Sequence, residues 1–371
     1  TSLPITIDPA SDTVSRLYGD KNEIRFGTAL DPKSSVAIQS GAQINASLAN
    51  SSYVAVVAPR VEQAGTVSVN GSAAYVAAEA ATMTINSGLF DIIVDSGSDD
   101  TEGVVHTGTT QWPATASSTD ANHRIYLVAV PKNQAMTAVV SGAMGYKGAT
   151  AASVVDGSIV LSAGYNVAGG SVSTAKAVGG NASLAISGLT VGQKGATSDL
   201  TGFATRDVTI DASTTSTSVR GTVNLQARRN VLATIGNDSS IVVDSGLSLG
   251  SMNGAKAGNV SVAVAGGSLN VGGTLDLYSI ATGAVQTDPL NGDALLAGSV
   301  GEDAVSGDVE LTITDGNFNL GGATLSSIAT SGVGELSAGS ATSGSVSIDI
   351  AQTDGAASTF GGSLGSVALY T

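Results

Sequence analysis

The stretch Gly258-Asn-Val-Ser-Val-Ala-Val264 alternates an apolar branched residue with a small or polar one. Successive side chains of a β-strand point to opposite faces, so this alternation predicts a half-buried strand. Two related stretches follow, Gly307-Asp-Val309 and Gly344-Ser-Val346, each opening with glycine, a polar residue and valine. This recurrence predicts a repeated β unit whose core lies on one side of each strand.

Further elements recur within these units. Each opening strand leads to a glycine pair, at Gly272-Gly273, Gly321-Gly322 and Gly361-Gly362. In the first two units an aliphatic strand then ends in Ser-Ile-Ala, at Ser279–Ala281 and Ser327–Ala329. The three units open at residues 258, 307 and 344 and are therefore unevenly spaced. Uneven spacing is typical of a solenoid that tolerates insertions at its turns.

The same alternation extends through the chain, whereas helical periodicity with capping residues is nearly absent. Short strands separated by Gly-Gly, Asn-Gly, Asp-Gly and Ser-Gly turns are expected throughout. Further examples are Leu3–Ile7, Val54–Val56, Val67–Val69, Val208–Ile210, Leu311–Ile313 and Val346–Ile350.

Composition supports a folded all-β chain. Of 371 residues, 48 are glycine, 4% are aromatic and 12% are charged, against about 25% charged in ordinary domains. So few charged residues exclude a coiled coil, and 42% hydrophobic residues provide apolar area to bury. A sandwich or barrel is the ordinary alternative, but small aliphatic inward positions fit a narrow interior better than a sandwich core. The prediction is a right-handed parallel β-helix with a side loop insertion.

The net charge of −15 and the pI of about 4.3 argue against nucleic acid or an anionic membrane surface as a partner. No stretch approaches the roughly 18 apolar residues of a membrane-spanning helix, so no transmembrane segment is expected. The absence of cysteine excludes disulfides, zinc-thiolate sites and thiol catalysis.

Residues 22–96 carry a more specific pattern. Asn22-Glu-Ile-Arg-Phe-Gly27 is followed by Tyr53-Val-Ala-Val-Val-Ala-Pro-Arg-Val61, by Gly65-Thr-Val67 and then by Ala74-Tyr-Val-Ala-Ala78. This order of elements resembles the β-helical exoproteins of the filamentous-haemagglutinin type, the substrates of two-partner secretion. In that family such elements mark consecutive coils, and weaker similarity extends through Arg124–Pro131 to about residue 165.

The resemblance implies a bacterial adhesin at the outer cell surface or outside the cell, exported by an outer-membrane secretion partner. The family's secretion domain carries Asn-Pro-Asn motifs, which are absent from this chain. Either the chain diverges from that signal, or it is an internal piece of a longer exoprotein.

Four segments are expected. They are an N-terminal strand or cap over 1–20, haemagglutinin-like coils over 21–94, an acidic to Ser/Thr-rich loop insertion over 95–122, and continuing coils with degenerate glycine-rich repeats over 123–371.

The insertion contains the candidate site residues. Asp95, Asp99, Asp100 and Glu102 provide oxygen donors that could bind Ca²⁺, although their order is not that of an established calcium loop, and an unliganded acidic turn is the alternative. No other cofactor is expected.

Three aromatic residues in and beyond the insertion are candidates for contact with a ligand. Trp112, with Tyr126 and Tyr146, could stack on a carbohydrate ring or cover a small core of the insertion. The chain's two histidines, His106 and His123, are expected to be solvated.

Parallel β-helices also include polysaccharide lyases and hydrolases, and the best candidates for such a site are Arg228 and Arg229 with Asp207 or Asp244. Because adjacent strand residues point to opposite faces, a surface charge pair is the simpler interpretation.

The function that these observations favour is that of a non-enzymatic adhesin whose shaft attaches to cells, glycans or proteins, or to neighbouring shafts. The alternatives are a self-assembling filament or matrix subunit, with end-to-end or lateral stacking, and a polysaccharide-degrading enzyme.

Overall fold

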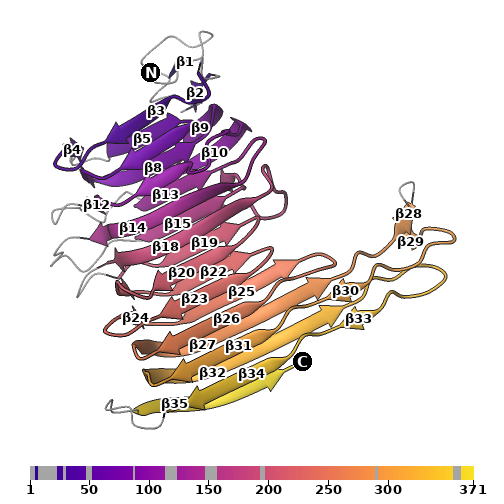
Figure 1. Cartoon of the computed structure of the whole chain (residues 1–371). Helices are drawn as coiled ribbons and strands as arrows, with labels where there is room; N and C mark the ends of the chain where they lie inside the picture. Colours follow the sequence, from indigo (N-terminus) through magenta and orange to yellow (C-terminus); the bar gives the residue numbers. More distant parts are fainter. Residues whose placement is uncertain are drawn as a thin grey trace. The chain divides into compact units, whose positions relative to one another are not determined.

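The computed structural model is built from β-strands, which confirms the all-β prediction (Figure 1). It describes residues 5–6, 23–27, 31–46, 52–86, 88–112, 123–146, 157–192, 197–288, 291–353 and 361–371. The chain divides into two compact units. Unit 1 comprises residues 1–205 and 217–223, and unit 2 comprises residues 206–216 and 224–371.

Unit 1 contains a large set of parallel strands that pair in register. For example, Val36, Val61 and Val104 lie opposite one another on three strands that are neighbours in the sheet. The parallel strands are β3 (Ser35–Ile38), β4 (Gln43–Ala46), β5 (Ser52–Ala58), β6 (Arg60–Gln63), β7 (Thr66–Val69), β8 (Gly71–Ala77), β11 (Val104–His106), β12 (Thr109–Trp112), β13 (Arg124–Ala129), β14 (Met136–Tyr146), β15 (Ser158–Ala163), β18 (Ala182–Val191), β19 (Leu200–Ala204) and β21 (Thr217–Val219).

A second, antiparallel sheet covers strand β8 of this array. All seven residues of β8 are buried, because Ala74 and Val76 pack against residues of the second sheet such as Met83 and Phe90. The strands of this sheet are β1 (Ile5–Thr6), β2 (Glu23–Phe26), β9 (Ala80–Asn86), β10 (Leu89–Ser96), β16 (Val167–Ala168) and β17 (Ser171–Val172).

Two expectations for unit 1 are wrong. The Ile-x-Phe-Gly element does not lie in the parallel array, because β2 pairs antiparallel with β9. The interval 95–122 is not a side loop over its described part, because β11 and β12 pair in parallel with β6, β7 and β14. The alternation Val104-Val-His106 and Thr109-Thr-Gln-Trp112 supplies two short strands inside the Ser/Thr-rich sequence. Residues 113–122 lie outside the described residues.

Unit 2 repeats one strand arrangement. Val260, Val309 and Val346 are register partners, so the three predicted repeat openings lie opposite one another. Ser279–Ala281 lies opposite Ser327–Ala329 as well. The strands are β20 (Val208–Ala212), β22 (Val223–Ala227), β23 (Val231–Ile235), β24 (Ser240–Val243), β25 (Leu247–Asn253), β26 (Val260–Ala265), β27 (Ser268–Thr282), β28 (Thr287–Asp288), β29 (Asn291–Leu295), β30 (Ala304–Val305), β31 (Val309–Thr314), β32 (Asn317–Thr330), β33 (Ala341–Thr342), β34 (Val346–Ala351) and β35 (Gly361–Tyr370), with residue 223 of β22 assigned to unit 1.

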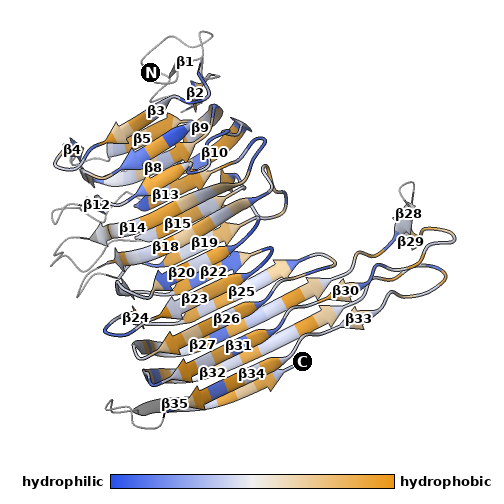
Figure 2. Ribbon diagram, in the orientation of Figure 1, coloured by the Kyte–Doolittle hydropathy of each residue, from blue (hydrophilic) through white to orange (hydrophobic). Residues whose placement is uncertain are grey.

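The glycine pair of the third unit is not where the repeat pattern predicts it. Gly361 and Gly362 lie opposite Asn317 and Phe318, not opposite the glycine pair Gly321-Gly322. The repeats are otherwise visible as apolar bands that run across neighbouring strands of unit 2 (Figure 2).

The glycine that opens each repeat is required by close stacking at one corner. A Cβ on Gly307 would lie 2.3 Å from the carbonyl oxygen of Gly258, and one on Gly344 would lie 2.4 Å from that of Gly307. These separations are shorter than van der Waals contact, so only glycine fits this column of positions.

A column of buried serines ties the same corner together. Ser279 Oγ donates to the Gly258 carbonyl and accepts from the Gly307 N–H, both at 2.8 Å. Ser327 Oγ repeats the pattern with Gly307 and Gly344, at 2.8 and 2.9 Å. We call Ser279 and Ser327 with their glycine partners the serine ladder; it explains the serine of the Ser-Ile-Ala repeats.

The Asp or Asn just before each strand-opening valine forms a second column, the Asx ladder, with the members Asp207, Asn230, Asn259 and Asp308. The backbone N–H of Asn259 donates to Asn230 Oδ1, and that of Asp308 donates to Asn259 Oδ1, both at 3.0 Å. The backbone N–H of Ser345 then donates to Asp308 Oδ1 at 2.7 Å. Polar residues at these positions therefore satisfy backbone donors of the next repeat.

Candidate functional site

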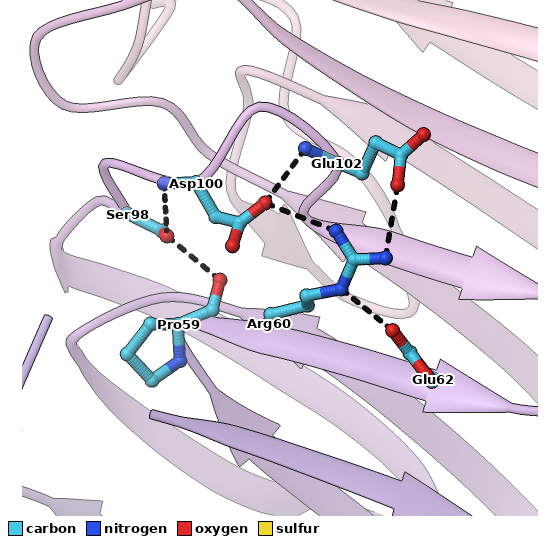
Figure 3. Close-up of polar contacts among 6 residues, drawn as sticks. All are labelled: Pro59, Arg60, Glu62, Ser98, Asp100 and Glu102. Atoms are coloured by element: carbon cyan, nitrogen blue, oxygen red, sulfur yellow. Dashed lines mark hydrogen bonds and ion pairs between the residues drawn. The ribbon is translucent and has the colours of Figure 1, made fainter. Parts of the chain in front are cut away.

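The predicted acidic cluster is organised by an arginine (Figure 3). Arg60, on β6, contacts Glu62 Oε1 through Nε at 2.7 Å, Glu102 Oε2 through Nη2 at 2.9 Å and Asp100 Oδ1 through Nη1 at 3.3 Å. Burial opposes the charged guanidinium, but the hydrogen bonds of Glu62 and Glu102 and the charge of Asp100 raise the pKa of Arg60. The turn between β10 and β11 is thus fastened to β6 by ion pairs.

The other two carboxylates have separate partners. Asp95 accepts a hydrogen bond from Thr82 at 2.9 Å, and Asp99 accepts two from the Asn133 amide at 2.9 and 3.1 Å. Within the described ranges, no group of three or more His, Asp or Glu side chains is placed to hold a metal ion. The four carboxylates of the sequence cluster thus have three different sets of partners, at Thr82, Asn133 and Arg60.

Both histidines are buried, so the expectation that they are solvated is wrong. His106 Nδ1 lies 2.8 Å from the Ser141 carbonyl oxygen, and its Nε2 lies 3.0 Å from Thr110 Oγ1. Burial lowers the pKa of His106 to about 4, although the hydrogen bond to Ser141 opposes this effect. His123 Nε2 lies 3.1 Å from Asn70 Oδ1.

The aromatic candidates are not a surface platform. Trp112 is fully buried and donates from Nε1 to the Gly71 carbonyl at 2.7 Å. Tyr126 is fully buried in the core between β8 and the antiparallel sheet. The ligand-stacking expectation is therefore wrong for these two residues. The backbone of Tyr146 pairs with that of Trp112, and its side chain lies outside the described residues.

Among the lyase candidates, Asp207 has well-defined partners. Asp207 Oδ2 pairs with Arg206 Nε at 3.1 Å, and its Oδ1 accepts from the Asn230 N–H at 3.0 Å as the first member of the Asx ladder. Arg229 is exposed and Arg228 is half-buried. Asp207 thus has a structural role that accounts for its position.

A different group of side chains forms an outward-facing surface on unit 2. Tyr278 lies opposite Gly250, and its ring lies across that glycine, where a Cβ would be 2.1 Å from Tyr278 Cζ. The Tyr278 hydroxyl accepts from Gln226 Nε2 at 2.6 Å. Leu275 and Leu277, which flank the outward residues of β27, are buried on the opposite face of the strand.

Polar side chains surround this ring. Asn224 and Gln226 on β22, Ser248 on β25 and Asp276 on β27 are all half-buried at outward positions. Burial raises the pKa of Tyr278, while its hydrogen bonds with Ser248 and Gln226 act in the opposite direction. These five residues are called the Tyr278 face; they provide one flat, fixed ring and several hydrogen-bonding groups.

The Tyr278 face could not be predicted from the sequence. The strand Leu275-Asp-Leu-Tyr278 places Tyr278 at an outward position, which the alternation shows. The partner glycine stands on another strand, however, so the ring's position becomes apparent only when the register of β25 and β27 is known.

Comparisons with known proteins found no matching protein-family model, no matching curated protein and no matching solved structure. No helix that could span a membrane occurs in the part of the chain that the structure describes.

Proposed function

We propose that the chain forms a right-handed parallel β-helix and serves as a non-enzymatic attachment protein on the outer surface of a bacterium or outside the cell. The helix is supported by the register of unit 2, where Val208, Val231, Val260, Val309 and Val346 pair in succession on parallel strands. Crossover connections between parallel strands are almost always right-handed, which gives the hand. Export by an outer-membrane partner follows from the resemblance to haemagglutinin-type exoproteins.

The ligand class that the Tyr278 face fits best is a glycan. Sugar rings present C–H groups that pack on aromatic faces and hydroxyls that pair with amide, hydroxyl and carboxylate groups. Tyr278 supplies the flat ring, and Gln226, Ser248 and Asp276 supply polar groups beside it. The observation that carries the proposal is the Tyr278 ring held across Gly250 by Gln226.

The test is binding of the purified chain to arrayed neutral and amino-sugar oligosaccharides. Tyr278→Ala is expected to weaken binding about tenfold or more, since an aromatic contact contributes roughly 1.5 kcal/mol. The control Thr312→Ala alters an outward residue on β31, away from the Tyr278 face, and should bind normally. Equal binding by the chain and Tyr278→Ala, or no binding to any glycan, would contradict the proposal.

The enzymatic rival makes a separate prediction. Release of reducing ends or unsaturated products from acidic polysaccharides, lost in Arg228→Ala or Arg229→Ala, would replace attachment by catalysis as the function.

A self-assembling filament subunit is the second candidate. Val367 and Leu369 on β35 are 44% and 52% exposed, whereas their register partners Ala323 and Leu325 on β32 are buried. Among the described strands β35 pairs with β32 alone, and an unpaired strand edge is a template for a strand from a second copy. A molar mass from light scattering that rises with protein concentration, but stays at the monomer value in Leu369→Glu, would favour this candidate. A molar mass of one chain at all concentrations would reject it.

A further inference from the structure

Two long segments of unit 2 leave the repeated strands and pair with each other. Residues 283–306, of which 289 and 290 lie outside the described residues, run from the end of β27 to the corner glycine Gly307, and residues 331–343 run from the end of β32 to the corner glycine Gly344. Figure 1 shows them, with β28, β29, β30 and β33, projecting beyond the ends of the long strands. We call the two segments the paired excursions.

Backbone hydrogen bonds hold the paired excursions in a defined arrangement. The Gln286 N–H donates to the carbonyl oxygen of Val333 at 2.9 Å. The Leu336 N–H donates to the carbonyl oxygen of Ser299, and the Gly301 N–H to that of Ser337, at the same distance. The Leu296 N–H donates to Gln286 at the same distance, which joins the two arms of the first excursion. The surface of the paired excursions is therefore held in place by hydrogen bonds within a single chain.

The paired excursions expose large apolar side chains. A small cluster of buried alanines lies at their base, formed by Ala257, Ala281 and Ala304. Apolar groups gathered on a surface are typical of interaction sites. The exposed residues, between 38% and 69% accessible, are Val285, Leu295, Leu296, Val300, Val333 and Leu336.

Charge in this part of the chain has one sign. Residues 257–371 contain eleven Asp or Glu and no Lys or Arg, whereas residues 1–256 contain nineteen acidic and all fifteen basic residues. Glu302, Asp303 and Glu335 stand on the paired excursions, and each uses one carboxylate oxygen to accept a backbone N–H, at 2.6 to 2.7 Å. The hydrogen bonds with Ser340 lower the pKa of Asp303, so it is ionised at neutral pH.

We propose that the paired excursions bind a cationic amphipathic polypeptide, with apolar residues that cover the exposed Val and Leu side chains and Lys or Arg residues that pair with the carboxylates. Charge complementarity selects this partner, because nucleic acid and the same acidic surface of a second copy would both be repelled. This binding site is separate from the Tyr278 face.

The probe is a labelled amphipathic peptide built only of Leu and Lys, titrated with the full chain and followed by fluorescence anisotropy. Two control peptides replace Leu by Ser or Lys by Glu. We expect the Leu–Lys peptide to bind most tightly, and its affinity to fall as NaCl rises from about 50 to 300 mM.

Variants locate the site. The double change Val300→Ser and Leu336→Ser should weaken binding at least about tenfold, the equivalent of 1.4 kcal/mol. The matched control changes Leu232→Ser and Met252→Ser, which are similarly exposed elsewhere on unit 2 and should leave binding unchanged. Glu302→Gln, Asp303→Asn and Glu335→Gln together keep an acceptor oxygen at each position and should reduce both the affinity and its salt dependence.

Several results would overturn the proposal: no binding of the Leu–Lys peptide, equal binding of the Leu–Glu or Ser–Lys peptide, or equal losses in the excursion and control variants. Tyr278→Ala should bind the peptide normally, so failure of the glycan proposal and failure of this one are distinguishable.

Discussion

The two units stabilise parallel strands by different means. Among the described residues, the buried aromatic and methionine side chains all lie in unit 1, among them Trp112, Tyr75 and Tyr126, and unit 1 also has a buried polar group at His106. Unit 2 has buried aliphatic residues and repeats the same short hydrogen bonds in the serine and Asx ladders. Individual, non-repeated contacts thus dominate unit 1, and many equivalent ones dominate unit 2. We expect single substitutions to have larger effects in unit 1.

The largest effect is expected for Trp112→Ala. Removing a buried indole costs about 3–5 kcal/mol and here also leaves the Gly71 carbonyl without its donor. Val262→Ala in unit 2 removes two buried methyl-sized groups and should cost roughly 1–2 kcal/mol. Urea unfolding of both variants checks this order, and equal losses would refute the contrast between the units.

A smaller loss is expected when the serine ladder is cut. Ser279→Ala leaves the Gly258 carbonyl and the Gly307 N–H without their partner, which costs about 1–3 kcal/mol. Ser261→Ala, at an outward position on β26, should change stability by less than about 0.5 kcal/mol. If the two alanine variants unfold at the same urea concentration, the ladder does not stabilise unit 2.

The alternating strands and the repeat openings could be predicted because period two and the Gly-polar-Val pattern are local properties of the sequence. Strand direction is not local, since alternation looks the same in parallel and antiparallel strands. The antiparallel position of Glu23–Phe26 was therefore missed.

The surroundings of the candidate site residues could not be predicted for a related reason. Trp112 and His106 stand in polar sequence that resembles a loop, and the parallel partners that bury them come from distant segments. Conversely, the Asp95–Glu102 cluster is compact in sequence, but its carboxylates have different partners in the structure.

Acidification should affect unit 1 through His106. Its pKa is about 4 in the fold and near 6.5 when unfolded, so the unfolded chain binds a proton first as the pH falls. Stability should therefore fall between pH 6.5 and 4, by at most about 1.4 kcal/mol per pH unit for this one proton.

The comparison with His106→Gln isolates that contribution. At pH 7 the unchanged chain should be the more stable of the two, and urea unfolding should show this difference shrinking towards pH 4. A difference that stays constant over this range would mean that His106 is already protonated, or exposed, in the folded chain.

The smallest effect is expected in the Asx ladder. Asn259→Ala removes the acceptor of the Asp308 N–H at an exposed corner, at a cost of about 0.5–1 kcal/mol. Asn259→Asp keeps an acceptor oxygen, as Asp308 does in the next repeat, and should be nearly neutral. Thermal unfolding measures both, and equal destabilisation by Ala and Asp would show that the side-chain acceptor contributes nothing.

The serine ladder also determines where the chain resumes after each departure from the strands. Ser279 holds Gly307 against Gly258 although the first of the paired excursions intervenes. Doubling the length of such a segment adds only about 0.6 kcal/mol of closure entropy. Foreign sequence grafted between residues 284 and 302 should therefore leave the repeated strands intact, which makes unit 2 a scaffold on which new recognition surfaces can be displayed.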